Sequence, residues 1–224
     1  LLLGHPMIAY TLITAKESKV FDKIIVASDS SEICEIGKYY GADEVVKRDL
    51  SDSTSTSLDI DWLTNLFNAG KLDSEFFAIL RPTSPLRSVK LINDCVQAFF
   101  SSEFDSLRTV KLVSEHPGKM WKLNESQEII PFLNQSKGEV AFHAKQYHSL
   151  EKLYIQTSVL EIAKTRVIPD SNTREGNSIF GFITEGIDSY SLDTFDDLEY
   201  LEYLCTQNPH LLCKIPLKPF RTKE

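Results

Sequence analysis

Cysteine is scarce in this chain and never paired at short spacing, which argues against a structural metal site. The 224 residues contain four cysteines, at positions 34, 95, 205 and 213, and they form no Cys-x-x-Cys pair. Zinc sites in small domains usually depend on such pairs. The sequence therefore predicts no zinc site, and it is typical of a cytoplasmic protein whose thiols stay reduced.

Long apolar runs and excess positive charge are also missing. No apolar stretch approaches the roughly 18 residues that a membrane-spanning helix needs, so a membrane is not an expected partner. Acidic residues outnumber basic ones by 32 to 24, and the net charge of −8 disfavours broad binding to nucleic acid. The hydrophobic fraction of 42% is ordinary for a globular protein, and the length suits one α/β domain.

The apolar pattern alternates between short β-branched runs and longer amphipathic segments. This alternation predicts βαβ units and a mostly parallel sheet. The expected strands are residues 23–27, 44–46, 76–80, 106–113, 153–157 and 179–183. The expected helices are residues 6–19, 31–40, 58–69, 88–100, 159–164 and 194–205.

The start of the sequence indicates that a strand is missing. Residues 1–3 are three leucines without a methionine, and the helix expected at 6–19 has no strand before it. A crossover helix in a parallel sheet connects two strands. We therefore expect a first strand and the loop after it upstream of Leu1.

Residues 115–150 interrupt the strand–helix rhythm. They contain a Pro-Gly turn, an aromatic strand pattern and a second apolar run, which together predict a β-hairpin arm. Exposed arms that carry side chains such as Trp121 and Phe132 often contact a second subunit. A hairpin folded onto its own sheet is an equally good interpretation of the pattern.

The segment LRPTSPLR, residues 80–87, ends an apolar strand with two prolines, two hydroxyls and two arginines. In open parallel sheets, ligands bind beyond the carboxyl ends of the strands. Arginine forks suit phosphate or carboxylate, and proline stiffens the backbone that presents them. The alternative is a rigid turn in which Ser84 caps the next helix, Pro85 starts it and Arg87 is solvated.

Two further polar loops follow expected strands. Residues 47–57 begin with Lys47-Arg48 and continue with hydroxyls, which could bind a ribose, a base edge or a phosphate. Asp193 stands at the start of the last helix, where its carboxylate could hold Mg²⁺ or could simply cap the helix. The GxSxG, HExxH and Walker A motifs are absent, which disfavours the reactions that depend on them.

Six segments, read together, are distinctive: LLLGHPMIAYTL, IIVASDSSEICEIGKYYGAD, LRPTSPLR, EHPGKMWKL with IIPF, KQYHSLEKLYIQTS and SLDTFDDLEYLE. Their order resembles the cytidylyltransferase family, which includes the CMP-sialic acid synthetases (acylneuraminate cytidylyltransferases). The resemblance spans residues 5–205. It implies a Rossmann-like three-layer α/β nucleotidyltransferase fold, one domain over residues 1–224, and an inserted arm at 115–150 that makes a homodimer.

The resemblance also implies the reaction and the residues that serve it. CTP and a sialic acid-like nonulosonic acid would give CMP-sugar and pyrophosphate, with Mg²⁺ as cofactor. The implied nucleotide-binding residues are Arg48, Ser53, Ser55, Pro82 and Thr83. The implied sugar-binding residues are Ser84, Arg87, Lys145 and Gln146. Asp193, as the metal ligand, and Arg81 are the implied catalytic residues.

The sequence departs from the family pattern at several points. The usual Asp-x-Asp pair reads Ser191-Leu192-Asp193, and Arg81 stands where many relatives have glutamine. Lys145-Gln146 stands where many have Arg-Gln. The family's glycine-rich triphosphate loop would lie upstream of Leu1. Three alternatives therefore stay open: a weakened homologue that only binds nucleotide-sugars, a nucleotidyltransferase for another base or an eight-carbon sugar acid, and an unrelated flavodoxin-like binding domain.

Overall fold

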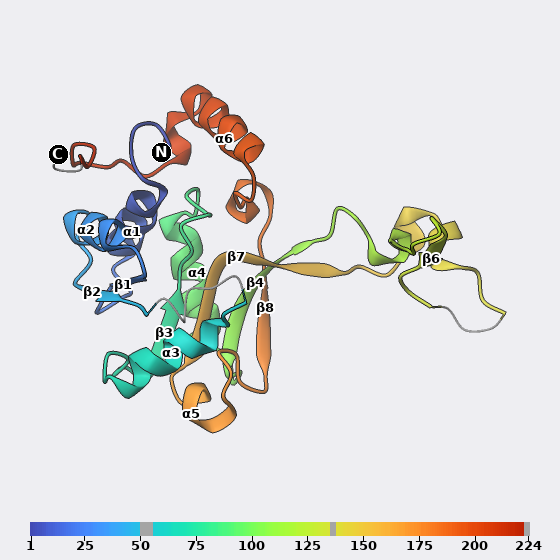
Figure 1. Cartoon of the computed structure of the whole chain (residues 1–224), viewed down its shortest axis with the longest axis horizontal. Helices are drawn as coiled ribbons and strands as arrows, with labels where there is room; N and C mark the ends of the chain where they lie inside the picture. Colours follow the sequence, from blue (N-terminus) through green and yellow to red (C-terminus); the bar gives the residue numbers. More distant parts are fainter. Residues whose placement is uncertain (50–55, 135–137, 222–224) are drawn as a thin grey trace.

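The structure is a computed structural model that describes residues 1–49, 56–134 and 138–221 (Figure 1). Its helices are α1 Met7–Ser18, α2 Ser31–Tyr39, α3 Asp59–Asn68, α4 Val89–Phe100, α5 Val167–Ser171 and α6 Phe195–Gln207. Its strands are β1 Ile25–Ser28, β2 Glu44–Lys47, β3 Phe76–Ile79, β4 Ser106–Leu112, β5 Trp121–Leu123, β6 Ile129–Pro131, β7 Tyr154–Lys164 and β8 Ile179–Ile183.

The core strands form two sheets that share no hydrogen-bonded strand. β1 and β2 pair in parallel, and a second sheet has the order β3-β7-β4-β8. β7 is antiparallel to both β3 and β4, whereas β8 is parallel to β4. β3, β4 and β8 therefore run in one direction and β7 runs against them. The sheet is mixed, with a parallel set that places the ends of β3, β4 and β8 on the same side.

Helices cover both faces of the larger sheet, which gives three layers (Figure 1). On one face, Leu91, Cys95 and Phe99 of α4 pack against Leu107 and Leu160. A separate cluster on the other face comprises Leu63, Ile79, Ala163, Val167 and Ile168, and joins α3 and α5 to the sheet. The expected α/β architecture is thereby confirmed.

One expected pair of elements is wrong. Residues 153–157 and 159–164 do not form a strand and then a helix, because β7 runs unbroken through both. β7 lies between β3 and β4, so its second half is mostly buried, and apolar residues follow one another without clear alternation. A strand buried on both faces resembles a buried helix in an apolar pattern of that length.

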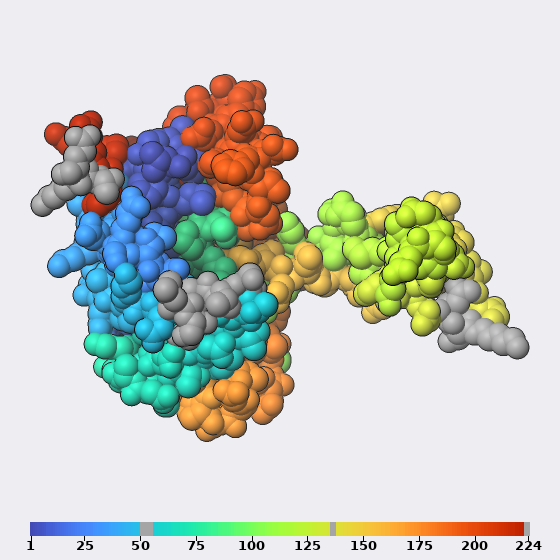
Figure 2. All heavy atoms as spheres, viewed as in Figure 1, coloured from blue at the N-terminus to red at the C-terminus, as the bar shows by residue number. Residues whose placement is uncertain are grey.

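The arm forms an antiparallel hairpin, β5–β6, and projects away from the rest of the molecule (Figures 1 and 2). Three-residue 3₁₀ turns at Pro117–Lys119, Phe142–Ala144 and Tyr147–Ser149 surround the hairpin. The arm thus does not fold back onto its own sheet. Among the helices of the described ranges, none combines the length and the hydropathy that crossing a bilayer requires.

Candidate active site

The LRPTSPLR segment forms two consecutive tight turns at the end of β3. The Ser84 N–H donates to the Arg81 carbonyl, and the Arg87 N–H donates to the Ser84 carbonyl, both at 3.3 Å. Ser88 then caps α4, because its hydroxyl accepts a bond from the Leu91 N–H at 3.1 Å. The alternative in which Ser84 caps a helix that starts at Pro85 is therefore wrong. The turn is an independent element between strand and helix.

Arg87 lies in the interior beneath this turn. Its side chain is only 3% exposed. Its Nε donates to the Val159 carbonyl, and its Nη2 donates to the Arg81 carbonyl at 2.9 Å. Burial lowers the pKa of the guanidinium to about 9, so the group is still cationic at neutral pH. Neither the solvated alternative nor a sugar contact agrees with this position, because the side chain braces the turn against β7.

Arg81 takes part in a charged cluster on the sheet face that α3 covers. Its guanidinium pairs with Asp59 at the start of α3, and lies 3.8 Å from Glu161 of β7. Arg108 and Arg174 contact the same Glu161 at 2.9 Å and 3.5 Å. Burial raises the pKa of Glu161 although Arg108 and Arg81 oppose that shift. Arg81 thus lies at the expected edge of the sheet, but its charge is already balanced by acidic neighbours.

Arg48 connects the loop after β2, to which it belongs, to the end of β1. Its backbone N–H donates to the Ser28 carbonyl at 2.9 Å, and its guanidinium lies 4.0 Å from Asp29. It also lies over the Trp62 ring, 5.7 Å from the ring centroid, at a distance typical of a cation–π contact. Its Nε is buried and has no hydrogen-bond partner in the described part of the chain. Arg48 is thus held at the end of β1 with one donor unused.

The loop that carries Asp193 lies against the turn after β3. The Leu192 N–H donates to the Thr83 carbonyl at 2.8 Å, although the two residues are far apart in the sequence. Leu192 is buried in a cluster with Leu86 of the same turn. This hydrogen bond fixes the start of α6 beside the Pro-Thr-Ser-Pro segment. Thr83 and Asp193, which sequence reasoning placed in one site, are therefore neighbours in the structure.

Asp193 does not cap α6. Thr194 is the N-cap, and its hydroxyl accepts a bond from the Asp197 N–H. The Asp197 carboxylate accepts bonds from the N–H groups of Asp193 and Thr194, at 3.0 Å and 2.8 Å. These bonds lower the pKa of Asp197. Because Asp197 and Thr194 complete the capping box, the exposed Asp193 carboxylate is available for a ligand.

The donor set at this position is compatible with Mg²⁺ that arrives with a nucleotide. Mg²⁺ sites in phosphate-transferring enzymes often use one or two carboxylates and complete the coordination with substrate phosphates. Asp193 supplies one exposed carboxylate, and Ser191 precedes it by two residues. The described residues contain no group of three or more His, Cys, Asp or Glu side chains that could hold an ion alone. The phosphates would therefore have to supply much of the coordination.

Two of the expected site residues, Lys145 and Gln146, are not brought to these loops. Lys145 and Gln146 lie on the arm, where the Lys145 ammonium stands 4.9 Å from the centroid of the Phe142 ring. In one copy of the chain, the arm projects away from the body that carries α6 (Figure 1). Ser53 and Ser55 lie outside the described residues. Ser84 is at the expected turn but is 1% exposed, and its hydroxyl has no partner in the described ranges.

Sequence reasoning missed the partners of the two arginines. These partners are Asp29 and Trp62 for Arg48, and Asp59 and Glu161 for Arg81. Asp59 has a local signal, because acidic residues are favoured in the first turn of a helix. The others come from separate elements, and only the packing of α3 on the sheet brings them together. They have no signal in the local sequence.

Comparison with known proteins places this arrangement in a family. Residues 1–214 match the family model described as Cytidylyltransferase. Over 140 residues, the chain is 32% identical to an N-acylneuraminate cytidylyltransferase of Streptococcus agalactiae, which covers 61% of this chain and 33% of that protein. It is 25% identical over 210 residues to a pseudaminic acid cytidylyltransferase of Campylobacter jejuni, covering 92% of this chain and 88% of that protein.

A solved structure supports the fold independently. CMP:2-keto-3-deoxy-manno-octonic acid synthetase complexed with CTP aligns with a TM-score of 0.63 at 12% identity, over 92% of this chain and 90% of that one. The chain spans only 33% of the length of the streptococcal proteins that it matches. The family model nevertheless covers nearly all of the chain, from residue 1 to residue 214. The chain therefore belongs to the cytidylyltransferase family.

Proposed function

We propose that this protein transfers CMP from CTP to a nonulosonic acid and releases pyrophosphate. The observation that carries the proposal is the hydrogen bond between Leu192 and Thr83, which places the free carboxylate of Asp193 beside the rigid turn after β3. Family membership supplies the reaction class. Relatives named for N-acylneuraminate and pseudaminic acid support a nonulosonic acid as the acceptor.

In the proposed reaction, a hydroxyl oxygen of the sugar acid forms a bond to the α-phosphorus of CTP. The bond from that phosphorus to the bridging oxygen breaks, pyrophosphate leaves, and the hydroxyl proton passes to solvent. Positioning and charge stabilisation dominate such transfers. Arg48 and the polar loop after it would bind the cytidine, and Pro82 with Thr83 would fix the floor of the site between nucleotide and sugar.

A bound Mg²⁺ would neutralise charge on the phosphate oxygens, and Asp193 is the residue that would hold it. Arg81 would act on the sugar side only after exchanging part of its ion pair with Asp59 for the substrate. Arg87 would keep the turn in place without touching the substrate. In this assignment, Arg81 lies at the surface of the site, whereas Arg87 supports the turn from beneath it.

The test is pyrophosphate release by the purified protein with Mg²⁺, each of the four nucleoside triphosphates, and in turn sialic, legionaminic and pseudaminic acids and an eight-carbon sugar acid. The proposal expects release with CTP and one of these acids. Release with another triphosphate, or with an eight-carbon acid alone, would replace the substrate assignment. CTP binding in calorimetry without release under any condition would favour the weakened homologue.

We further propose that the arm makes a homodimer. Exposed apolar side chains cover it: Met120, Trp121, Leu123, Ile129, Ile130, Phe132 and Val140. Such a concentration of apolar surface is typical of a protein interface. In the proposed dimer, the arm carries Lys145 and Gln146 to the loops of the other copy.

Replacing Ile129 with aspartate tests the dimer. Ile129 pairs with Leu123 across the hairpin, and both are more than half exposed. A buried carboxylate at an interface has a large desolvation cost, so we expect the dimer Kd to rise about 100-fold in sedimentation experiments. Ser126→Asp, at the hairpin turn, is the matched control and should leave the dimer intact. A wild-type chain that sediments as a monomer would contradict the proposal.

A further inference from the structure

A row of four residues crosses the larger sheet on the face that α3 covers. Ile79 of β3 pairs with Glu161 of β7, which pairs with Arg108 of β4. Arg108 pairs in turn with Gly181 of β8, the edge strand (Figure 1). Directly paired residues of neighbouring strands share a face of the sheet. Ile79 is buried beneath α3, whereas Gly181 is exposed, so the row runs from a covered part of the sheet to an open part.

Charged side chains beside this row form one ion network. It consists of three arginines and three carboxylates: Arg81, Arg108, Arg174, Asp59, Glu161 and Glu175. These side chains are between 12% and 33% exposed. Removing charges from water costs free energy, and apolar residues of similar volume often stabilise a protein as well or better. Recognition of a polar ligand therefore explains the network better than stability does.

Arg174 and Glu175 present unused hydrogen-bonding atoms at the border of the network. Glu175 accepts bonds from Arg108 and Arg174 through Oε1 alone. Arg174 donates through Nε and Nη1. Arg174 Nη2 and Glu175 Oε2 have no hydrogen-bond partner in the described part of the chain. A donor and an acceptor on adjacent, touching side chains match a hydroxyl group, which can accept one bond and donate another.

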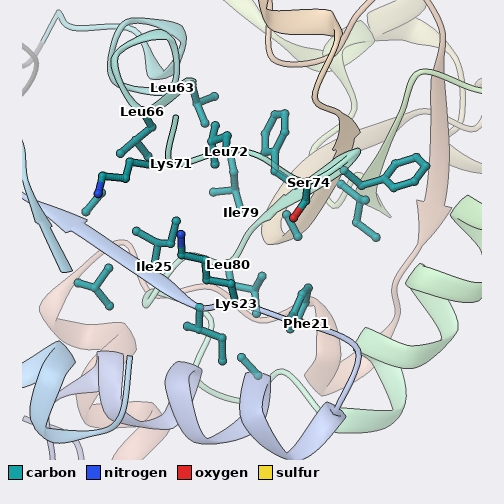
Figure 3. Close-up of a pocket in the computed structure, with 18 of the residues that line it drawn as sticks. Phe21, Lys23, Ile25, Leu63, Leu66, Lys71, Leu72, Ser74, Ile79 and Leu80 are labelled. Atoms are coloured by element: carbon teal, nitrogen blue, oxygen red, sulfur yellow. The ribbon is translucent and has the colours of Figure 1, made fainter. Parts of the chain in front are cut away.

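Arg81 connects the ion network to the loops of the proposed active site. It precedes Thr83 by two residues, and the Thr83 carbonyl accepts the bond from the Leu192 N–H. Arg81 also lines the cavity between β1 and β3, where Figure 3 shows the apolar side chains of Ile79 and Leu80. Apolar side chains offer no hydrogen bonds. The polar substituents of an acceptor that reaches Arg81 would therefore bind on the network side.

We propose that the ion network selects the acceptor: a nonulosonic acid with a hydroxyl, in place of an acylamino group, on the side that faces Arg174 and Glu175. This inference rests on the proposed function and narrows its acceptor. A Cβ added at Gly181 would meet only Val110 among the described residues, at 3.8 Å, so there is room beside the network. An acylamino group ends in a methyl group, which would separate the charged atoms from water without replacing their hydrogen bonds.

The test is a competition, with CTP and Mg²⁺, between N-acetylneuraminic acid and the nine-carbon acid that has a hydroxyl in place of its acetamido group. We expect the ratio of the two kcat/KM values to favour the hydroxyl acid by at least about 100-fold. The double variant Arg174→Leu, Glu175→Leu should reduce this ratio to below about tenfold, mainly by lowering kcat/KM for the hydroxyl acid. Because both acids compete for the same enzyme, the ratio does not depend on the folded fraction.

A second ion pair provides the matched control. Lys23 and Glu44 pair at 2.9 Å, the distance between Arg174 Nε and Glu175 Oε1, but lie at the opposite ends of the strands β1 and β2. Replacing both with leucine should leave the ratio unchanged. If the double variant of the network does not fold, Glu175→Gln keeps the shape of the side chain and should still lower the ratio at least about threefold.

The outcomes separate this inference from the proposed function. Preference for the acetamido acid would overturn the inference alone, and so would a ratio that neither network variant changes. A third acid, with a free amine at the same position, completes the panel. Its selection over the hydroxyl acid would mean that the carboxylates bind an ammonium group, which also overturns the inference. CMP transfer to none of the acids would overturn the proposed function and this inference with it.

Discussion

Asp193→Asn is expected to lower kcat/KM for CMP transfer by about 100- to 1,000-fold, while the fold keeps its stability. The carboxylate is exposed and contributes nothing to the cap of α6, because Thr194 and Asp197 form that cap. Asparagine has nearly the same shape but removes the negative charge that would hold Mg²⁺. Pyrophosphate release measured over a range of Mg²⁺ concentrations checks this, together with thermal unfolding of the variant.

Two neighbours of Asp193 provide matched controls. Asp196→Asn changes an exposed carboxylate in the first turn of the same helix and should leave turnover close to wild type. Asp197→Asn should instead destabilise the protein by about 1 kcal/mol, because it weakens the capping box. Turnover of Asp193→Asn close to wild type at limiting Mg²⁺ would remove Asp193 from the metal site.

The sequence alone could predict this distinction only in part. The residues around Asp193 are compatible with a metal ligand or a helix cap, yet the segment Thr194–Asp197 has the Thr-x-x-Asp spacing of a capping box. That spacing favours Thr194 as the cap and leaves the Asp193 carboxylate free for a ligand. The contact of Leu192 with Thr83 was not predictable in detail, because it depends on how α6 packs over the turn.

The fold, too, could be predicted from the sequence only in part. The strands β1, β3 and β8 and the helices α2 and α4 follow from short apolar runs, serine caps and the polar residues that end them. β7 could not be identified from the sequence as one strand, because its pairing with β4 is irregular at its centre. Its register against β4 shifts between Arg108 and Val110, so four residues of β7 oppose one residue of β4. The local sequence indicates only the secondary-structure propensity of a segment, whereas this irregularity depends on groups from other elements.

These groups are Thr109 and Arg87, which supply hydrogen bonds that the ladder cannot. The Thr109 hydroxyl donates to the Leu160 carbonyl at 3.1 Å and accepts from the Leu160 N–H at 3.2 Å. The Arg87 Nε donates to the Val159 carbonyl in the same irregular stretch. Bulges often occur beside active sites, where they redirect the strand. Arg87 therefore links the turn after β3 to the point where β7 departs from regular pairing.

Arg87→Met is expected to destabilise the protein by about 2–5 kcal/mol, because it leaves the buried carbonyls of Val159 and Arg81 without their donor. Arg87→Lys should lower the free energy of unfolding by less, since one ammonium can still reach one of the two carbonyls. Lys90→Met, one turn along on the exposed side of α4, is the control and should change stability by under about 0.5 kcal/mol. Urea unfolding measures all three variants.

Kinetic measurements on the same variants test whether Arg87 supports the turn or contacts the substrate. If Arg87 supports the turn from below, the folded fraction of Arg87→Lys should bind the sugar acid with a KM close to wild type. A KM that rises at least about tenfold in Arg87→Lys, with stability unchanged, would mean that the guanidinium reaches the sugar after all. It would also mean that the turn opens during turnover, because the side chain is 3% exposed in the structure.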